Sequence, residues 1–196
     1  VMSHQGQYPV VSLTFKDVKS TDFDTAFHKI HQEITREYLR HTTPDISWQS
    51  VYEQRQWQDI LDGKADQATL TNSLNLLMRT LRRIHKQRIV VLVDEYDAPI
   101  HAGYQYGYYD EVVLLMRNLL SGGVKDNSDL EKGVITGILR ISRESIFSGL
   151  NNLDVYSLLN LGFSEYFGFT EPEVTRLLQD FGLAESEKQV REWYNG

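Results

Sequence analysis

Cysteine is absent from the 196-residue chain, so disulfide bonds and thiolate metal sites are both excluded. Long apolar runs are absent too, since none approaches the roughly 20 residues that a membrane-spanning helix needs. The first ten residues lack the basic-then-apolar pattern of a secretory signal. No internal repeat and no low-complexity linker interrupts the sequence. From these absences we expect a soluble, cytoplasmic protein with no membrane partner.

Neither sign of charge dominates strongly. The chain has 20 Lys and Arg against 27 Asp and Glu, for a net charge of −7. A mildly acidic surface disfavours extensive nucleic-acid binding, and nothing else in the chain indicates such a partner. Hydrophobic residues make up 41% of the sequence, which is enough for one core at this length. We therefore expect one domain, with at most a small appendage.

Strand-like and helix-like segments alternate along the chain. The expected strands are residues 8–15, 89–93 and 133–139, with a weaker candidate at 155–161. Apolar periodicity, capping residues and helix breakers predict helices over about 23–38, 46–61, 67–86, 110–121, 142–148, 171–181 and 185–194. Ser20 or Thr21 is the expected N-cap of the first helix, and Thr170 with Glu173 forms a capping box. This alternation predicts an α/β fold with a mainly parallel sheet.

The segment IVVLVDEYDAPI, residues 89–100, places carboxylates directly after the most apolar run of the chain. An unbroken β-branched run is typical of a strand buried on both faces of a parallel sheet. Asp94 and Glu95 then lie at the carboxyl end of that strand, where open α/β sheets bind their ligands. Asp97, which precedes Ala98 and Pro99, is interpreted as a turn or helix-cap residue.

An apolar strand that ends in Asp-Glu resembles the Walker B element of P-loop ATPases. Four further segments resemble the bacterial AAA-ATPase-like family in order and spacing: YPVVSLTFKDVKS, ITGILRISRESIFSGLNNL, FGFTEPEV and WYNG. The resemblance implies a P-loop-NTPase-like three-layer sandwich over residues 1–162 and the start of a helical lid over 163–196. It also implies that Asp94 holds Mg²⁺ and that Glu95 activates the attacking water. Longer members of the family typically continue into a nuclease-like domain.

The phosphate loop of that family, G-x-x-x-x-G-K-[ST], is not found in the sequence. Gly63-Lys64 is followed by alanine, and Gly122-Gly123 has the wrong spacing to Lys125. We therefore expect a fragment that begins after this loop, with ATP and Mg²⁺ bound only in the full-length parent. In the family the missing strand lies beside the third strand found here. Its loss is expected to leave an apolar edge. Either residues 155–161 then pair with 133–139, or two chains self-associate through this edge, and we favour self-association.

Three residues around the third strand are candidates for contact with nucleotide. By resemblance to related ATPases, Arg140 or Thr136 would sense the γ-phosphate, and Arg143 could reach a neighbouring site. The alternative is that the arginines form surface ion pairs, for example with Glu144, which contribute about 0–1 kcal/mol. The tyrosine-rich residues 101–109 would form a loop near the same face, packed by its own rings.

Two other functions remain possible from the residues alone. The chain could be a non-catalytic regulatory or interaction domain that kept the fold, although both Asp94 and Glu95 are intact. A metal-dependent nuclease could use Asp94, Glu95 and Asp97, and Asp17-Val18-Lys19 gives a D-x-K after a strand. That motif needs an acidic residue upstream on a neighbouring strand, and none precedes Asp17. The basic residues of 79–88 are interpreted as a solvated helix face, because no aromatic residue interleaves them.

Overall fold

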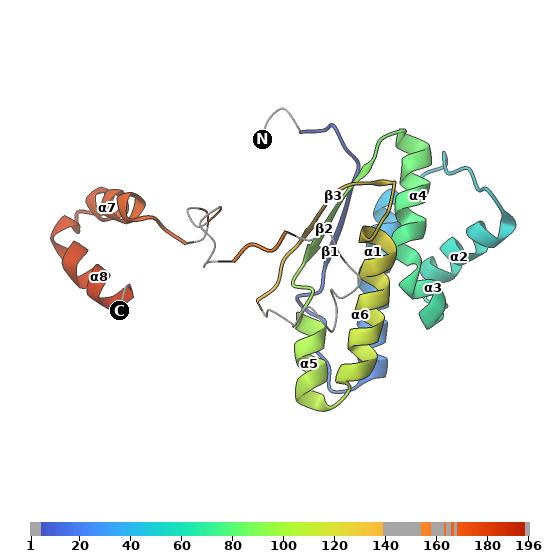
Figure 1. Cartoon of the computed structure of the whole chain (residues 1–196), viewed down its shortest axis with the longest axis horizontal. Coiled ribbons are helices and arrows are strands. Elements are labelled where there is room, and N and C mark those ends of the chain that lie inside the picture. Colours follow the sequence, from blue (N-terminus) through green and yellow to red (C-terminus); the bar gives the residue numbers. More distant parts are fainter. Residues whose placement is uncertain (1–4, 139–153, 158–162, 164–165, 167, 195–196) are drawn as a thin grey trace. The chain divides into compact units, whose positions relative to one another are not determined.

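The computed structural model describes residues 5–138, 154–157, 163, 166 and 168–194, and the chain divides into two compact units, Val1–Asn152 and Leu153–Gly196 (Figure 1). The first unit contains β1 (Val10–Thr14), α1 (Phe23–His41), α2 (Val51–Leu61), α3 (Gln67–Thr71), α4 (Ser73–His85), β2 (Ile89–Asp94), α5 (Ala98–Tyr106), α6 (Tyr109–Val124) and β3 (Leu130–Ile135). The second unit contains α7 (Glu171–Asp180), η3 (Ala184–Ser186) and α8 (Glu187–Tyr194).

The three strands form a parallel sheet in the order β1-β2-β3. The predicted α/β class and parallel sheet are therefore confirmed. The third strand begins and ends earlier than predicted: it runs from Leu130 to Ile135. Residues 154–157 have no regular secondary structure, and residues 158–161 of the weaker strand candidate lie outside the described residues.

Burial along β2 alternates, which corrects the expectation of a strand buried on both faces. Val91 and Val93 are buried, whereas Leu92 is 38% exposed. In the described part of the chain, α1, α4 and α6 pack against β1, β2 and β3 and cover the Val91 face (Figure 1). The described residues of the first unit thus form two layers, and none of them forms the third layer of the expected sandwich.

Two helices have other N-caps or starts than predicted, and one expected helix is divided. Asp22 caps α1 instead of Ser20 or Thr21, and its carboxylate accepts a hydrogen bond from the Thr25 amide (2.8 Å). Ser50 caps α2, so this helix begins later than residue 46. The single helix expected over 67–86 is divided at Asn72 into α3 and α4.

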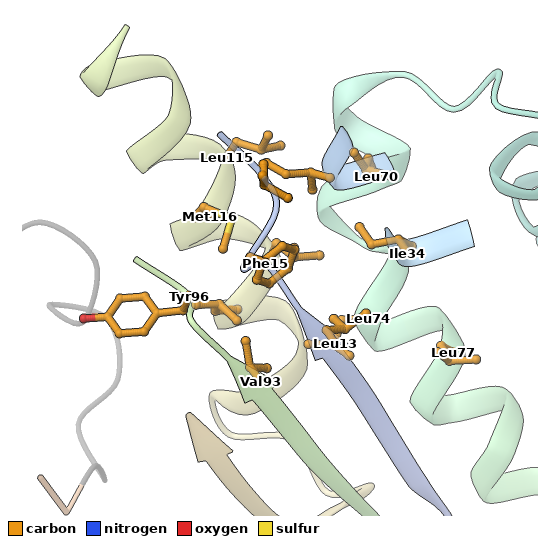
Figure 2. Packing of buried hydrophobic residues seen from close by; sticks show 14 of the residues in the cluster. Leu13, Phe15, Ile34, Leu70, Leu74, Leu77, Val93, Tyr96, Leu115 and Met116 are labelled. Carbon is orange, nitrogen blue, oxygen red and sulfur yellow. The ribbon is translucent and has the colours of Figure 1, made fainter. Parts of the chain in front are cut away.

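The core lies between the sheet and the helices. Figure 2 shows Leu13 of β1, Phe15 just after it, Val93 of β2 and Met116 of α6 pointing into this core, and all four are buried. Helix α6 approaches α4 closely, because a Cβ atom on Gly123 would lie 2.3 Å from Cδ2 of Leu74. These contacts hold β2 rigidly and fix where its carboxyl end lies.

Most of the tyrosine-rich segment 101–109 is helical and not a loop: residues 101–106 belong to α5, Tyr109 begins α6, and Gly107 and Tyr108 connect the two helices. Tyr104 is 78% exposed, but Tyr108 is buried. The Tyr108 hydroxyl donates a hydrogen bond to the Ser20 carbonyl (2.8 Å) and its ring contacts Phe23. Tyr108 therefore ties the start of α6 to the segment before α1 through both its ring and its hydroxyl.

The second unit is a pair of short helices. The predicted capping box is confirmed, since the Glu173 carboxylate accepts hydrogen bonds from the Thr170 amide (2.8 Å) and hydroxyl (2.7 Å). Leu178 is buried, whereas Phe181 and Trp193 are each more than 70% exposed. No helix in the described ranges has the length and apolar composition that crossing a bilayer requires.

Candidate functional site

Asp94 and Thr136 meet at the carboxyl edge of the sheet. Asp94 is the last residue of β2, and Thr136 directly follows β3. The Thr136 amide donates to the Val93 carbonyl (2.8 Å), which extends the strand pairing by one residue. The Thr136 hydroxyl donates a hydrogen bond to Oδ1 of Asp94. Two residues 42 positions apart thus form one polar group, because parallel strands end at the same edge.

Glu95 turns the chain sharply after β2. Its φ of 51° lies in the left-handed region, which costs a non-glycine residue about 1–2 kcal/mol. The Glu95 amide points to the Thr136 hydroxyl in a long hydrogen bond (3.4 Å), and the Tyr96 amide donates to the Thr136 carbonyl (3.1 Å). The side chain of Glu95 is half-buried, whereas Asp94 is exposed. Two carboxylates with different surroundings therefore lie side by side at this edge.

Asp97 is buried and fixes the segment that follows β3. Its Oδ2 accepts a hydrogen bond from the Ile138 amide (2.8 Å). Asp97 occupies the N-cap position of α5 without a capping bond from its side chain, so the helix-cap interpretation holds for position only. A Cβ atom on Gly137 would lie 2.6 Å from the Tyr96 ring and 2.8 Å from Oδ1 of Asp97. Only glycine lets the backbone pass this close.

The donor set at this edge suits a magnesium ion that keeps most of its own water. Mg²⁺ is usually held by one or two carboxylates together with substrate phosphates and several waters. Asp94 offers one exposed carboxylate, and Thr136 offers a hydroxyl oxygen. In the described ranges no three His, Asp or Glu side chains converge to form a complete metal site. The residues therefore fit a metal brought with a phosphate ligand better than a closed structural site.

The predicted site residues divide into two groups. Asp94, Glu95 and Thr136 are brought together at one edge. Arg140 and Arg143 lie outside the described residues, as does the helix predicted over 142–148. The link from Asp97 to Ile138 was missed by sequence reasoning. The one signal in the sequence was Asp97 shortly after the strand, with Pro99 two residues further on.

The basic residues of 79–88 are not simply a solvated face, and the interpretation is corrected. Glu53 is buried on α2, and its Oε1 lies 2.9 Å from Nη2 of Arg83 and 3.5 Å from Nη2 of Arg79. Arg88, by contrast, forms an exposed pair with Glu131. No local pattern distinguishes Glu53 from a surface glutamate, because its burial arises from the packing of α2 on α4.

A second buried carboxylate, Glu37, anchors α1 to the sheet. It accepts hydrogen bonds from the Ser12 amide (2.8 Å) and from the side chains of Arg40 and His41. Burial raises the pKa of this carboxyl, but the hydrogen bonds from His41, Arg40 and Ser12 outweigh burial and hold the pKa below its ordinary value. Glu37 is therefore ionised at neutral pH and fully engaged in structural contacts.

Comparison with known proteins supports one family over most of the chain. Residues 1–147 match the family model described as Predicted AAA-ATPase. An Azotobacter chroococcum mcd 1 protein, described as an uncharacterized protein in the vnfD 5' region, is 33% identical over 121 residues. The match covers 61% of this chain and 23% of that protein, so the chain spans less than a quarter of this relative. No solved structure matches the chain significantly.

Proposed function

Because the chain belongs to the family described as Predicted AAA-ATPase, we propose that it carries the metal-binding and water-activating part of an ATPase site. The observation that carries the proposal is the hydrogen bond between Thr136 and Asp94 at the carboxyl edge of adjacent parallel strands. Glu95 follows at once in a strained turn. In this arrangement the strand that ends in Asp-Glu acts as a Walker B element, and Thr136 acts as a sensor beside it.

The proposed division of labour follows from the surroundings of each side chain. Asp94, exposed at the edge, holds Mg²⁺ through an oxygen ligand or through water. When bound, the ion neutralises charge on the phosphates during phosphoryl transfer. Glu95 accepts a proton from the attacking water. Thr136 holds the Asp94 carboxylate in place through its hydroxyl. Arg140 and Arg143 stay proposed nucleotide contacts.

The proposed activity needs a phosphate loop that the sequence does not contain. Neither Gly63-Lys64 nor Gly122-Gly123 fits the pattern, so no backbone cradle for β- and γ-phosphates accompanies Asp94. We propose that ATP hydrolysis belongs to a longer cytoplasmic protein with a P-loop-NTPase-like fold, in which this chain is joined to such a loop. The chain by itself should show no ATPase activity above background and no Mg²⁺-dependent ATP binding.

Substitution Asp94→Asn tests this proposal in a protein that joins the sequence to a phosphate loop. The amide keeps the shape of the side chain but removes the charge that attracts Mg²⁺. Turnover should fall by about 10²-fold or more, and ATP binding should lose its dependence on Mg²⁺. Asp45→Asn, an exposed aspartate between α1 and α2, is the matched control and should leave both properties unchanged. Unaltered Mg²⁺ dependence in Asp94→Asn would rule out a Walker B role.

A further inference from the structure

We propose that the first unit holds a second binding site, which takes the oxyanion group of a small polar ligand. The site is a pocket of about 340 Å³ between α2 and the start of α4. Its walls include the side chains of Gln49, Tyr52, Glu53, Gln56, Asn72 and Arg79. In Figure 1, α2 lies on the far side of α4 from the strands. The pocket thus shares no residue with the proposed ATPase site and does not depend on that proposal.

The charges at the pocket leave a cationic excess. Both oxygens of the Glu53 carboxylate are already engaged. Oε2 accepts a hydrogen bond from the backbone amide of Gln49 (2.8 Å), and Oε1 accepts one from the Arg83 guanidinium (2.9 Å). Arg79 shares Oε1 at the longer distance of 3.5 Å. Two guanidinium groups therefore face one buried carboxylate. The surplus of one positive charge is shared between Arg83, whose side chain is 18% exposed, and Arg79, which lines the pocket and is 43% exposed.

Donors next to the pocket also lack acceptors. Nε of Arg79 is buried and has no hydrogen-bond partner among the described residues. The same is true of Nε and Nη1 of Arg83 behind it. A buried N–H group without an acceptor costs free energy, and more so when it carries charge. Arg79 lines the pocket and its side chain is 43% exposed, so the accessible part of its guanidinium can donate to an oxygen atom bound there, while the buried Nε groups keep the site short of acceptors.

The lining indicates which kind of ligand fits. A guanidinium group offers two parallel N–H donors, which match the paired oxygens of a carboxylate or a phosphate. The side-chain amides of Gln49, Gln56 and Asn72 can each donate and accept hydrogen bonds, which suits polar groups on the rest of a ligand. The first turn of α2, which begins at Val51, adds a positive electrostatic potential.

Isothermal titration calorimetry on this chain tests the site, with inorganic phosphate and succinate as separate probes. At least one of them should bind saturably with a dissociation constant at or below about 1 mM. Preference for phosphate would indicate a phosphorylated ligand, and preference for succinate would indicate a carboxylic acid. Arg79→Gln should weaken binding about tenfold or more, because a charged hydrogen-bond donor is lost.

The control is Arg55→Gln, which removes an 80% exposed arginine of α2 that does not line the pocket and should leave binding unchanged. Gln56→Leu keeps both arginines and serves if Arg79→Gln does not fold, as judged by thermal unfolding. It should weaken binding several-fold, because it removes one lining amide. The site does not exist if neither probe binds saturably to the unaltered chain. Equal loss of binding in Arg55→Gln and Arg79→Gln would also overturn it, because the attraction would then be unspecific.

Discussion

Thr136 joins the ends of two strands through a single hydroxyl group. The hydroxyl donates a hydrogen bond to the Asp94 carboxylate and accepts a long one from the Glu95 amide (3.4 Å). The backbone of Thr136 is hydrogen-bonded to the backbones of Val93 and Tyr96. The orientation of the acidic pair is therefore set by a residue on another strand. Glu37 plays the corresponding structural part at β1, where its buried carboxylate accepts the Ser12 amide. In both cases one side chain fixes backbone that lies far away in the sequence.

Glu37→Gln should lower the free energy of unfolding by about 1–3 kcal/mol at neutral pH, because a buried carboxylate with charged donors loses its charge. The folded-state pKa of Glu37 lies below its ordinary value. Its contribution is therefore complete above the unfolded-state pKa and is lost as pH falls through the folded-state pKa. Urea unfolding from about pH 7 to pH 3 should show the two proteins converging in acid. A difference in stability that stays constant across this range would contradict the assignment.

Helix α6 packs against α4 through glycines, and the two neighbouring glycines have different surroundings. A Cβ atom on Gly123 would lie 2.3 Å from the buried side chain of Leu74, whereas a Cβ atom on Gly122 would meet nothing closer than the Thr71 carbonyl oxygen at 3.5 Å. The close approach of these helices determines how tightly they cover the sheet. It therefore contributes to the position of β2 and of the acidic pair at its end.

Gly123→Ala should destabilise the fold by about 1–3 kcal/mol, because the added methyl group overlaps Leu74 in a packed core. Gly122→Ala is the matched control at the next position of the same helix. It should be neutral or stabilising by up to about 1 kcal/mol, because alanine favours helix over glycine. Thermal or urea unfolding measures both. Equal effects of the two substitutions would show that α6 does not approach α4 as described.

The sequence pattern predicted those strands and helix starts that depend on neighbouring residues in the chain. The run that ends in Asp94 predicted both the strand and the edge where carboxylates gather, and the capping box at Thr170 predicted the start of α7. The division at Asn72 and the buried Glu53 could not be predicted, because they depend on how helices distant in sequence pack together. Pairing of Asp97 with Ile138 is likewise a tertiary contact with no periodic signal.

For the whole molecule, the β3 edge of the sheet and the sheet face opposite the helices are two surfaces through which chains could associate. Among the described residues β3 pairs only with β2. On the face opposite the helices, Leu92 is 38% exposed and Val134 is 43% exposed. Glu131 and Lys132 occupy the first half of β3, so its uncharged part is Gly133–Ile135. An uncharged strand edge invites pairing with another chain, and an apolar face beside it adds surface to bury.

We predict that the purified chain self-associates through this edge and face, because association removes both from water. Light scattering at tens of micromolar, a concentration at which even weak contacts are populated, should report a dimer or larger species. Val134→Lys should shift the equilibrium toward monomer, since it places a charge on the exposed face. Tyr104→Lys, at a 78% exposed position on α5, is the control and should leave the association unchanged. A monomer for the unaltered chain would refute this prediction.

The central claim is that the strand ending in Asp94 and Glu95 forms the hydrolytic half of an ATPase site. Its most direct test is Glu95→Gln in a protein that joins this sequence to a phosphate loop, with ATP binding and single-turnover hydrolysis measured together. The amide keeps the size of the side chain but cannot accept the proton of the attacking water. We predict that ATP binding is retained while hydrolysis falls by about 10²-fold or more. Hydrolysis within a few-fold of the unaltered protein would contradict the account.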